Sequence, residues 1–273
     1  MIGLKLKLWR GIGAAAALSL AAACGGEGGE ASHAGEGGEG EGGEGAVTAP
    51  PAPTADSGGE SGESGEAGAA SAYAGVSGAQ LTALRLQHLK GFLMAADSVA
   101  NANMAAEATV LVQQGLLEVY DAAPADFGSL NVDVVRAATD ASLNRAQLLT
   151  RLRAAEAEID RASGALEEVD HAALAARMVD IATGLYQSVN QNDLVDPIEY
   201  QHSMGAALAA RDALTKGASD MRGENAAAFT EAQTEAGRLV ALWREPVAPA
   251  HPAAYRDVLA QGSRVRLALS PFL

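Results

Sequence analysis

The stretch DPIEYQHSMGAALAARDALTK, residues 196–216, decides the fold class of this chain. Asp196 is a residue type that caps the N-terminus of a helix, and Pro197 suits the first helical position because its fixed φ is already helical. Glu199 stands three residues after the cap, which is the spacing of a capping box. Apolar residues then recur every three or four positions, so we predict a helix that runs to about Lys216.

Helical spacing of apolar residues continues on both sides of this stretch, from about Gln80 to Leu273. We expect further helices over about residues 80–101, 104–121, 132–162, 170–190, 219–243 and 251–269, with a break allowed inside the third. Short loops between such helices favour antiparallel neighbours. The predicted fold is therefore an all-α, up-and-down bundle of about six to seven helices, in a domain that spans residues 80–273.

The composition agrees with a helical domain and excludes several classes of protein. Aromatic residues make up only 4% of the chain, which does not suit the core of a β-sandwich or barrel. A single Cys excludes a disulfide framework and a thiolate zinc site. The formal charge of −15 argues against a nucleic acid partner, because phosphate binding needs clustered Lys and Arg.

Residues 1–23 have the pattern of a secretory signal peptide. Lys5, Lys7 and Arg10 form a basic beginning, and the uncharged segment Gly11–Ala23 follows. This segment is thirteen residues long, which is too short for a bilayer-spanning helix of ~20 residues. We therefore expect an exported protein.

The run Leu20-Ala21-Ala22-Ala23-Cys24 resembles the lipobox of bacterial lipoproteins, in which the Cys becomes the lipidated first residue of the mature protein. Leu20 lies one position further from the Cys than in the usual lipobox. We expect lipidation at Cys24, and the alternative is ordinary cleavage after Ala23, which releases a soluble protein. Gly25 follows the Cys, where an Asp often marks retention in the inner membrane. We therefore expect an anchor facing the periplasm, in the outer membrane rather than the inner.

The segment after the Cys has the composition of a disordered spacer. Residues 25–79 hold eighteen Gly, nine Glu, one Asp and no Lys or Arg. Such a segment has little to bury and repels itself. Its r.m.s. reach as a flexible chain is about 40 Å. We expect residues 24–79 to be a lipidated, acidic linker that lets the domain clear the membrane surface.

Residues 80–273 contain none of the common catalytic motifs. There is no His-Glu-x-x-His, no P-loop, no dinucleotide-binding Gly-x-Gly-x-x-Gly and no Gly-x-Ser-x-Gly. The only Cys is taken up by the predicted anchor, so a Cys nucleophile is excluded as well. We expect a protein that is not an enzyme.

Two Glu-x-x-His pairs are the candidates for a metal site: Glu168 with His171, and Glu199 with His202. Residues three apart share a helix face, and helical bundles hold di-metal carboxylate sites with such pairs. Glu118 is a candidate for a further ligand. The structural alternative is that both Glu residues serve helix N-termini and that the His residues are partly buried core residues.

Part of the domain resembles a family of uncharacterised envelope lipoproteins from Gram-negative bacteria with a Gly/Glu-rich tether and a helical-hairpin domain. Gly91, Leu93, Glu118 and Tyr120 match its first motif. Three His positions of that motif are occupied here by Phe92, Leu111 and Gln114. The second half matches better, through Tyr186-Gln187-Ser188-Val189, Leu194-Val195-Asp196-Pro197, Glu199-Tyr200-Gln201 and Gly205. This half is also similar to periplasmic domains associated with high-affinity iron permeases, so the resemblance implies an envelope role near metal uptake.

Two functions follow as hypotheses. The first is a membrane-tethered, non-enzymatic binding module with a protein partner in the cell envelope, accessory to metal (iron) uptake. The second is a metal-binding or di-metal carboxylate redox protein that uses iron or another divalent metal. It would use Glu199 and His202, with Glu118 or with Glu168 and His171.

Overall fold

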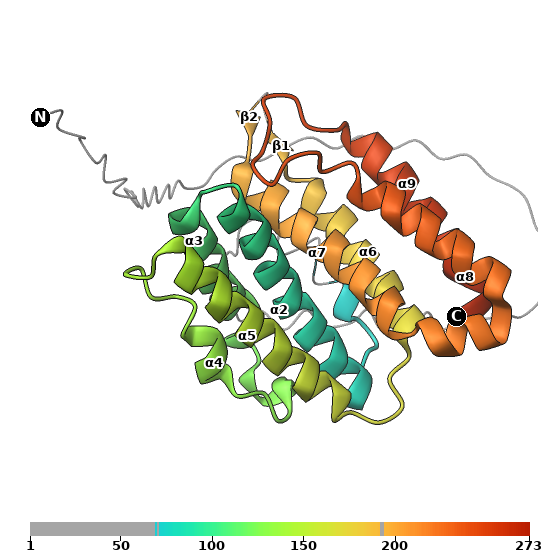
Figure 1. Cartoon of the computed structure of the whole chain (residues 1–273). Helices are drawn as coiled ribbons and strands as arrows, with labels where there is room; N and C mark the ends of the chain where they lie inside the picture. The colour runs from blue at the N-terminus through green and yellow to red at the C-terminus, as the bar shows by residue number, and fades with distance from the viewer. Residues whose placement is uncertain (1–68, 70, 192–193) are drawn as a thin grey trace, which may run out of the picture. The chain divides into compact units, whose positions relative to one another are not determined.

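The computed structural model of the chain describes residues 69, 71–191 and 194–273, and within these residues the protein is an all-α bundle, as predicted (Figure 1). Its main helices are α2 (Gly78–Asn101), α3 (Ala105–Gly115), α4 (Val132–Arg136), α5 (Arg145–Gly164), α6 (His171–Tyr186), α7 (Pro197–Lys216), α8 (Ala218–Val240) and α9 (Tyr255–Leu269). Shorter elements are the 3₁₀ turns η1 (Ser71–Tyr73), η3 (Pro124–Phe127) and η4 (Ser270–Phe272) and the π-helical turn η2 (Leu116–Tyr120). Strands β1 (Asn190–Gln191) and β2 (Leu194–Val195) pair antiparallel.

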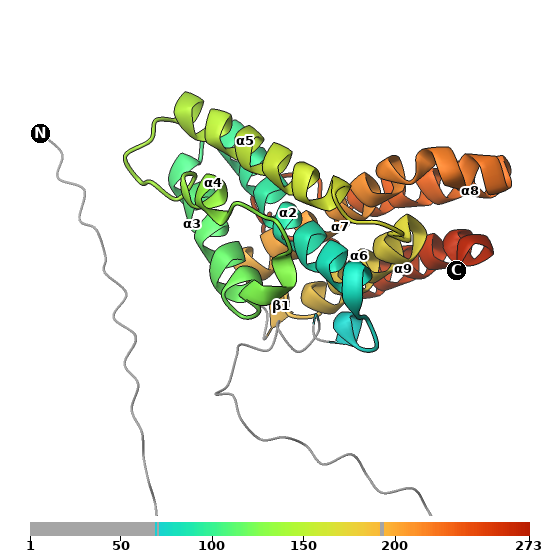
Figure 2. The same cartoon turned by 90° about the horizontal axis from the view of Figure 1, so that it is seen from below.

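Helices α2 and α7 form the centre of the bundle. Helix α2 packs against α7, α3 and α5, while α7 packs against α6 on another side. Helices α8 and α9 pair with each other, and this hairpin contacts α7 through α8 and α6 through α9. Figures 1 and 2 show the hairpin at one side of the bundle and α3, α4 and α5 at the other.

Helix α7 begins where the sequence predicts. The carboxylate of Asp196 accepts hydrogen bonds from the backbone N–H groups of Ile198 (2.8 Å) and Glu199 (3.3 Å). The N–H of Asp196, which a capping box assigns to the Glu side chain, donates to the carbonyl of Val189 at 2.8 Å. Most of α7 is buried, because α2, α6 and α8 together cover it on several sides.

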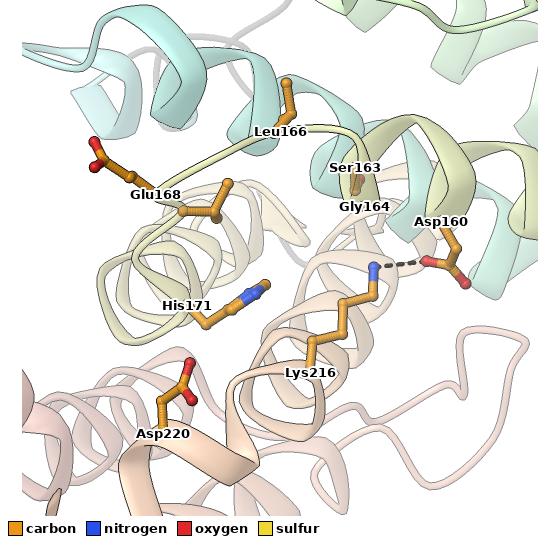
Figure 3. Close-up of a pocket in the computed structure, with 9 residues that line it drawn as sticks. Asp160, Ser163, Gly164, Leu166, Glu168, His171, Lys216 and Asp220 are labelled. Atoms are coloured by element: carbon orange, nitrogen blue, oxygen red, sulfur yellow. Dashed lines mark ion pairs between the residues drawn. The ribbon is translucent and has the colours of Figure 1, made fainter.

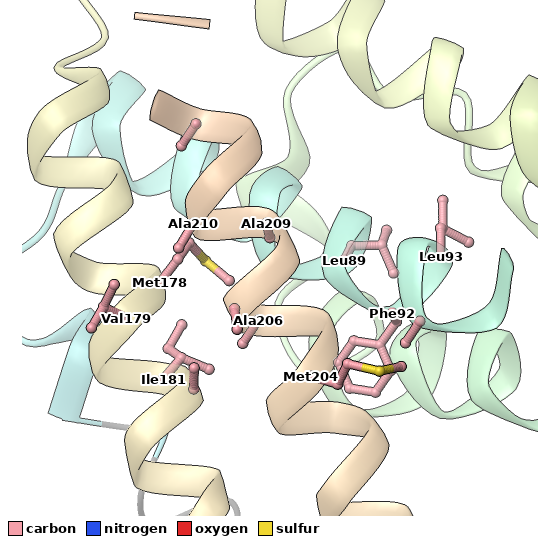
Figure 4. Close-up of a cluster of buried hydrophobic side chains, with 14 of the residues drawn as sticks. Leu89, Phe92, Leu93, Met178, Val179, Ile181, Met204, Ala206, Ala209 and Ala210 are labelled. Atoms are coloured by element: carbon pink, nitrogen blue, oxygen red, sulfur yellow. The ribbon is translucent and has the colours of Figure 1, made fainter. Parts of the chain in front are cut away.

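The two central helices approach most closely at two glycines, Gly91 of α2 and Gly205 of α7. A Cβ atom added to Gly91 would lie 2.9 Å from the carbonyl oxygen of Gly205, and one added to Gly205 would lie closer still to the carbonyl oxygen of Gly91. Figure 4 shows the apolar side chains around this crossing, including Leu89, Phe92 and Leu93 of α2 and Met204, Ala206 and Ala209 of α7. Small residues thus let the helix backbones touch.

The structure corrects several predicted helix limits. The helix expected over 104–121 ends as α-helix at Gly115 and continues as a π-helical turn. The helix expected over 132–162 is broken, as the prediction allowed, and α5 starts after its N-cap Asn144, whose side chain forms a full capping box with Gln147. The helix expected over 170–190 ends at Tyr186, because the chain turns into β1.

The folded unit also begins before Gln80, the predicted domain boundary. Ala69 and Ala72 are buried against the core, and the hydroxyl of Tyr73 lies 2.6 Å from Nδ1 of His88. This short alanine-rich segment resembles the end of the linker in sequence, so its composition does not reveal that it packs on the core.

The predicted signal peptide, the predicted lipidation site Cys24 and most of the predicted linker lie outside the described residues. Within the described part of the chain, none of the helices has both the length and the apolar character needed to traverse a bilayer.

Candidate functional site

His202 lies at a junction of three elements near the start of α7. Its Nε2 atom is 3.2 Å from Oε1 of Gln114 on α3, and its Nδ1 atom is 3.6 Å from Oε2 of Glu118 on η2. The ring of Phe92, on α2, packs against the imidazole with 4.6 Å between centroids. The structure thus brings together two predicted candidates, His202 and Glu118. It also places Phe92 and Gln114 beside them.

The His202 imidazole is neutral at pH 7. Burial lowers the pKa of His202 to about 4, and the charge of Asp196 offsets this shift only in part. A neutral imidazole is the form that binds a metal. His202 and Glu118 therefore offer one nitrogen and one carboxylate at the same junction.

A second buried imidazole, that of His88, lies on the other side of Phe92. Burial, assisted by His202 and Arg85, lowers the pKa of His88 to about 3. Its Nδ1 faces the Tyr73 hydroxyl, while its Nε2 is buried without a hydrogen-bond partner among the described residues. The side chain is a core histidine, as its place on an apolar helix face predicts.

The other predicted pair, Glu168 and His171, lies at the opposite end of α7. His171 begins α6, and its Cβ abuts Gly217, the residue between α7 and α8. Fifteen residues of helix separate Gly217 from His202, a length of about 22 Å. The two Glu-x-x-His pairs are therefore not brought to one point, and a single di-metal site built from both is excluded.

Glu168 and His171 also do not share a helix face. Glu168 precedes the helix and has a left-handed backbone with φ of 57°. The N-cap of α6 is Asp170, whose carboxylate accepts from the N–H of Ala173 at 2.8 Å. Figure 3 shows the Glu168 carboxylate turned away from His171. The predicted i, i+3 geometry fails because the helix begins one turn too late.

His171 instead lines a cavity of about 510 Å³ between the end of α5, the α5–α6 loop, the end of α7 and the start of α8 (Figure 3). The volume lies within the range of small-molecule sites, ~300–1,000 Å³. Its lining residues are Asp160, Ser163, Gly164, Leu166, Glu168, Val169, His171, Lys216 and Asp220.

One wall of this cavity belongs to a network of four charged side chains. Nζ of Lys90 lies 2.8 Å from Asp160 and 2.9 Å from Asp212, and Nζ of Lys216 lies 2.6 Å and 3.3 Å from the same carboxylates. Burial opposes the charge of Lys90, but hydrogen bonds to Asp160 and Asp212 outweigh it and raise the pKa of Lys90. The network is charge-balanced and joins α2, α5 and α7 beside the cavity.

Sequence reasoning did not single out this network or the cavity. The available signal was Lys90, a charged residue within the buried face of the first predicted helix, since a buried Lys requires a partner. No sequence signal identified which carboxylates would meet it, because Asp160 and Asp212 lie 70 and 122 residues away.

Among residues 69, 71–191 and 194–273, no three His, Cys, Asp or Glu side chains are grouped so as to hold a metal ion. No protein-family model, curated protein or solved structure matches the chain. A function for this protein is therefore inferred from its own sequence and geometry.

Proposed function

We propose that the chain is a lipoprotein of the cell envelope whose helical domain acts as a non-enzymatic binding module. The observation that carries this proposal is the order of parts along the sequence. An uncharged segment ends at the only Cys, an acidic Gly-rich segment without Lys or Arg follows, and a folded helical domain comes last. A lipid on Cys24 would hold the domain near the membrane, and the spacer would give it reach.

The anchor is tested by labelling the full chain in a Gram-negative host with an alkyne-tagged fatty acid. The parent protein should take up the label and sediment with the outer membrane. Cys24→Ser should lose both the label and the sedimentation, while Gly25→Asp should keep the label and shift to the inner membrane. Labelled Cys24→Ser protein would disprove the anchor.

Three surface leucines are positions at which a protein partner can be probed. Leu117 on η2, Leu194 on β2 and Leu267 on α9 are 67%, 74% and 74% exposed. Contiguous apolar patches mark binding surfaces, whereas single exposed apolar side chains are normal, so a partner has to be detected by experiment. A photo-crosslinking amino acid at each position, in cells, should capture one envelope protein from at least one site. If the same amino acid at exposed Glu231 captures the same protein to the same extent, the capture is not specific to the leucines and the partner is contradicted.

A place near iron uptake is the finer part of the proposal. It is supported by the residues that resemble periplasmic domains of iron permeases, which lie at the end of α6, on β2 and at the start of α7. Deleting the protein should slow growth under iron limitation, and the parent but not Cys24→Ser should restore it. Equal growth with and without the protein would refute the role in iron uptake and would leave the lipid anchor and the binding module unaffected.

Metal binding is the alternative function, and the 3.6 Å approach of His202 to Glu118 favours it. Residues 24–273 with Cys24→Ser, purified without chelator, should then contain Fe, Cu, Zn or Mn by elemental analysis, with the metal lost in Glu118→Gln and His202→Gln. Glu168→Gln is the matched control, since Glu168 lies at the other end of α7. A metal-free protein that no added metal stabilises would exclude the alternative.

A further inference from the structure

The cavity between α5, α6, α7 and α8 has side chains whose hydrogen-bonding capacity is not used within the fold. Nδ1 of His171 and Oγ of Ser163 are buried without a hydrogen-bond partner among the described residues. Buried polar atoms of this kind are normally satisfied by protein, water or a ligand. Both belong to the lining of the same 510 Å³ space.

Asp220 adds an unpaired charge to this cavity. It lies in the first turn of α8, and its carboxylate has no ion-pair or hydrogen-bond partner in the described part of the chain. In Figure 3 the Asp220 carboxylate points toward the His171 ring. Lys216 is different, because Asp160 and Asp212 already take up its ammonium group.

The charge of the cavity lining determines which charge a bound ligand should carry. Burial and the nearby Lys216 lower the pKa of His171, so its imidazole is neutral at pH 7 and offers a lone pair. Lys216 is already balanced within the network of Lys90, Asp160 and Asp212, so Asp220 and Glu168 leave the lining with an excess of negative charge. A carboxylate accepts hydrogen bonds, and a neutral imidazole nitrogen and a hydroxyl oxygen are able to accept them too. The matching ligand is a cation that donates hydrogen bonds.

The α5–α6 loop gives this polar site an apolar side. Leu166 and Val169 line the cavity and pack against the core. Apolar lining next to a few convergent polar groups is the usual composition of a small-molecule site. A ligand with a short hydrocarbon chain behind its cationic group would therefore bury that chain against the loop.

We propose that this cavity binds a small organic ammonium compound of the alkylamine or diamine class. The ammonium group donates to the Asp220 carboxylate, and Nδ1 of His171 and Oγ of Ser163 are further acceptors in the lining. The alkyl chain lies along Leu166 and Val169. This site goes beyond the envelope binding module described above, because it depends neither on the lipid at Cys24 nor on a protein partner.

The test uses residues 24–273 with Cys24→Ser, so that the acidic segment stays in place. The probes are 1,4-diaminobutane and butylamine, and butan-1-ol and butyrate are the neutral and anionic counterparts of matched length. Calorimetric titration should show saturable binding of one amine per chain, and the methyl NMR signals of Leu166 and Val169 should shift with the same affinity. Butan-1-ol and butyrate should give neither effect.

Asp220→Asn removes the charge from an exposed position, so the fold survives and circular dichroism verifies this. It should weaken amine binding at least tenfold. Asp257→Asn is the matched control, since Asp257 occupies the first turn of α9 and is also exposed, and it should change the affinity less than twofold. Ser163→Ala should weaken binding by a smaller factor.

Three results would overturn the proposal. The first is that neither amine gives saturable binding. The second is that both amines bind Asp220→Asn as tightly as the parent, which would assign the binding to the Glu-rich segment. The third is preferential binding of butyrate, which would mean that Lys216 is the recognising group. None of these results bears on the lipid anchor, which the labelling experiment tests separately.

Discussion

Replacing Gly205 with Ala should destabilise the protein, although Ala is the better helix former. The new Cβ would collide with the backbone of α2 at Gly91, and backbone atoms cannot move aside as a flexible side chain can. Helices α2 and α7 would have to separate along the whole crossing shown in Figure 4.

The size of the effect follows from two opposing terms. Overpacking a tight core costs typically 1–3 kcal/mol, and a backbone collision belongs at about 3 kcal/mol. Replacing Gly by Ala inside a helix returns about 1 kcal/mol. The net loss is about 2 kcal/mol in the free energy of unfolding, or roughly 4–8 °C in Tm for a domain of this size.

Thermal unfolding followed by circular dichroism measures this effect, with Gly237→Ala as the matched control. Gly237 lies inside α8, and a Cβ added there meets nothing within 4 Å. The control should therefore gain about 0.5–1 kcal/mol and melt a few degrees higher. Gly91→Ala should fall below the parent but above Gly205→Ala, because its collision is milder. A Gly205→Ala protein that melts at or above the parent would refute the reasoning.

Four further predictions concern other parts of the bundle. Tyr73→Phe removes the hydroxyl that faces the buried Nδ1 of His88, and urea denaturation should show a loss of about 1–3 kcal/mol; an unchanged midpoint would mean that η1 does not belong to the cooperative unit. Asn144→Ala removes the capping box of α5 and should lower the free energy of unfolding by about 1 kcal/mol, measured as a lower urea midpoint with an unchanged m-value. Lys90→Met leaves two partly buried carboxylates with one ammonium group, and should cost about 2 kcal/mol because solvent reaches part of the network; retention of full stability would show that the network is not strengthened by burial. Burial lowers the pKa of His88 to about 3 and that of His202 to about 4, so as the pH falls below 6.5 the unfolded chain takes up protons before the folded one. The stability that these two histidines contribute should therefore be full above that pH and decrease toward pH 4, by up to about 1.4 kcal/mol per pH unit for each. Glu156, whose pKa burial raises to about 7, acts in the opposite sense in the parent and the variant alike, so the test is the difference between them: His202→Phe should lower the slope of Tm against pH.

Local sequence signals were sufficient for most of the fold. Helix α7 starts at its predicted cap and ends at Lys216 as predicted, because capping and helical spacing act within a few residues. Asn103 follows α2 in the left-handed conformation that Asn tolerates at helix ends, with φ of 68°. Where prediction failed, the cause lies further along the chain. The turn from α6 into β1 depends on pairing with β2, which no helical pattern reports.

The candidate site was less predictable, for the same reason. His202 is a candidate through its spacing from Glu199 and Glu118 through its residue type, and these two side chains do meet, 84 positions apart in the sequence. Glu168 and His171 were named from their spacing, which assumed that both lie on one helix, and the positive φ of Glu168 breaks that assumption. Ser163, Lys216 and Asp220 form a cavity with His171 only because α5, α7 and α8 end or begin at one place.

The first turn of the folded unit has a mechanical consequence. The chain that leads back to Cys24 joins the domain at η1, where Ala72 is 1% exposed and Tyr73 faces His88 of α2. A force applied along that chain therefore acts on the packing of Ala72 and on the contact between Tyr73 and His88 before it acts on the first turn of α2. The contact therefore resists separation of the start of α2 from the bundle when the N-terminal side of the domain is pulled.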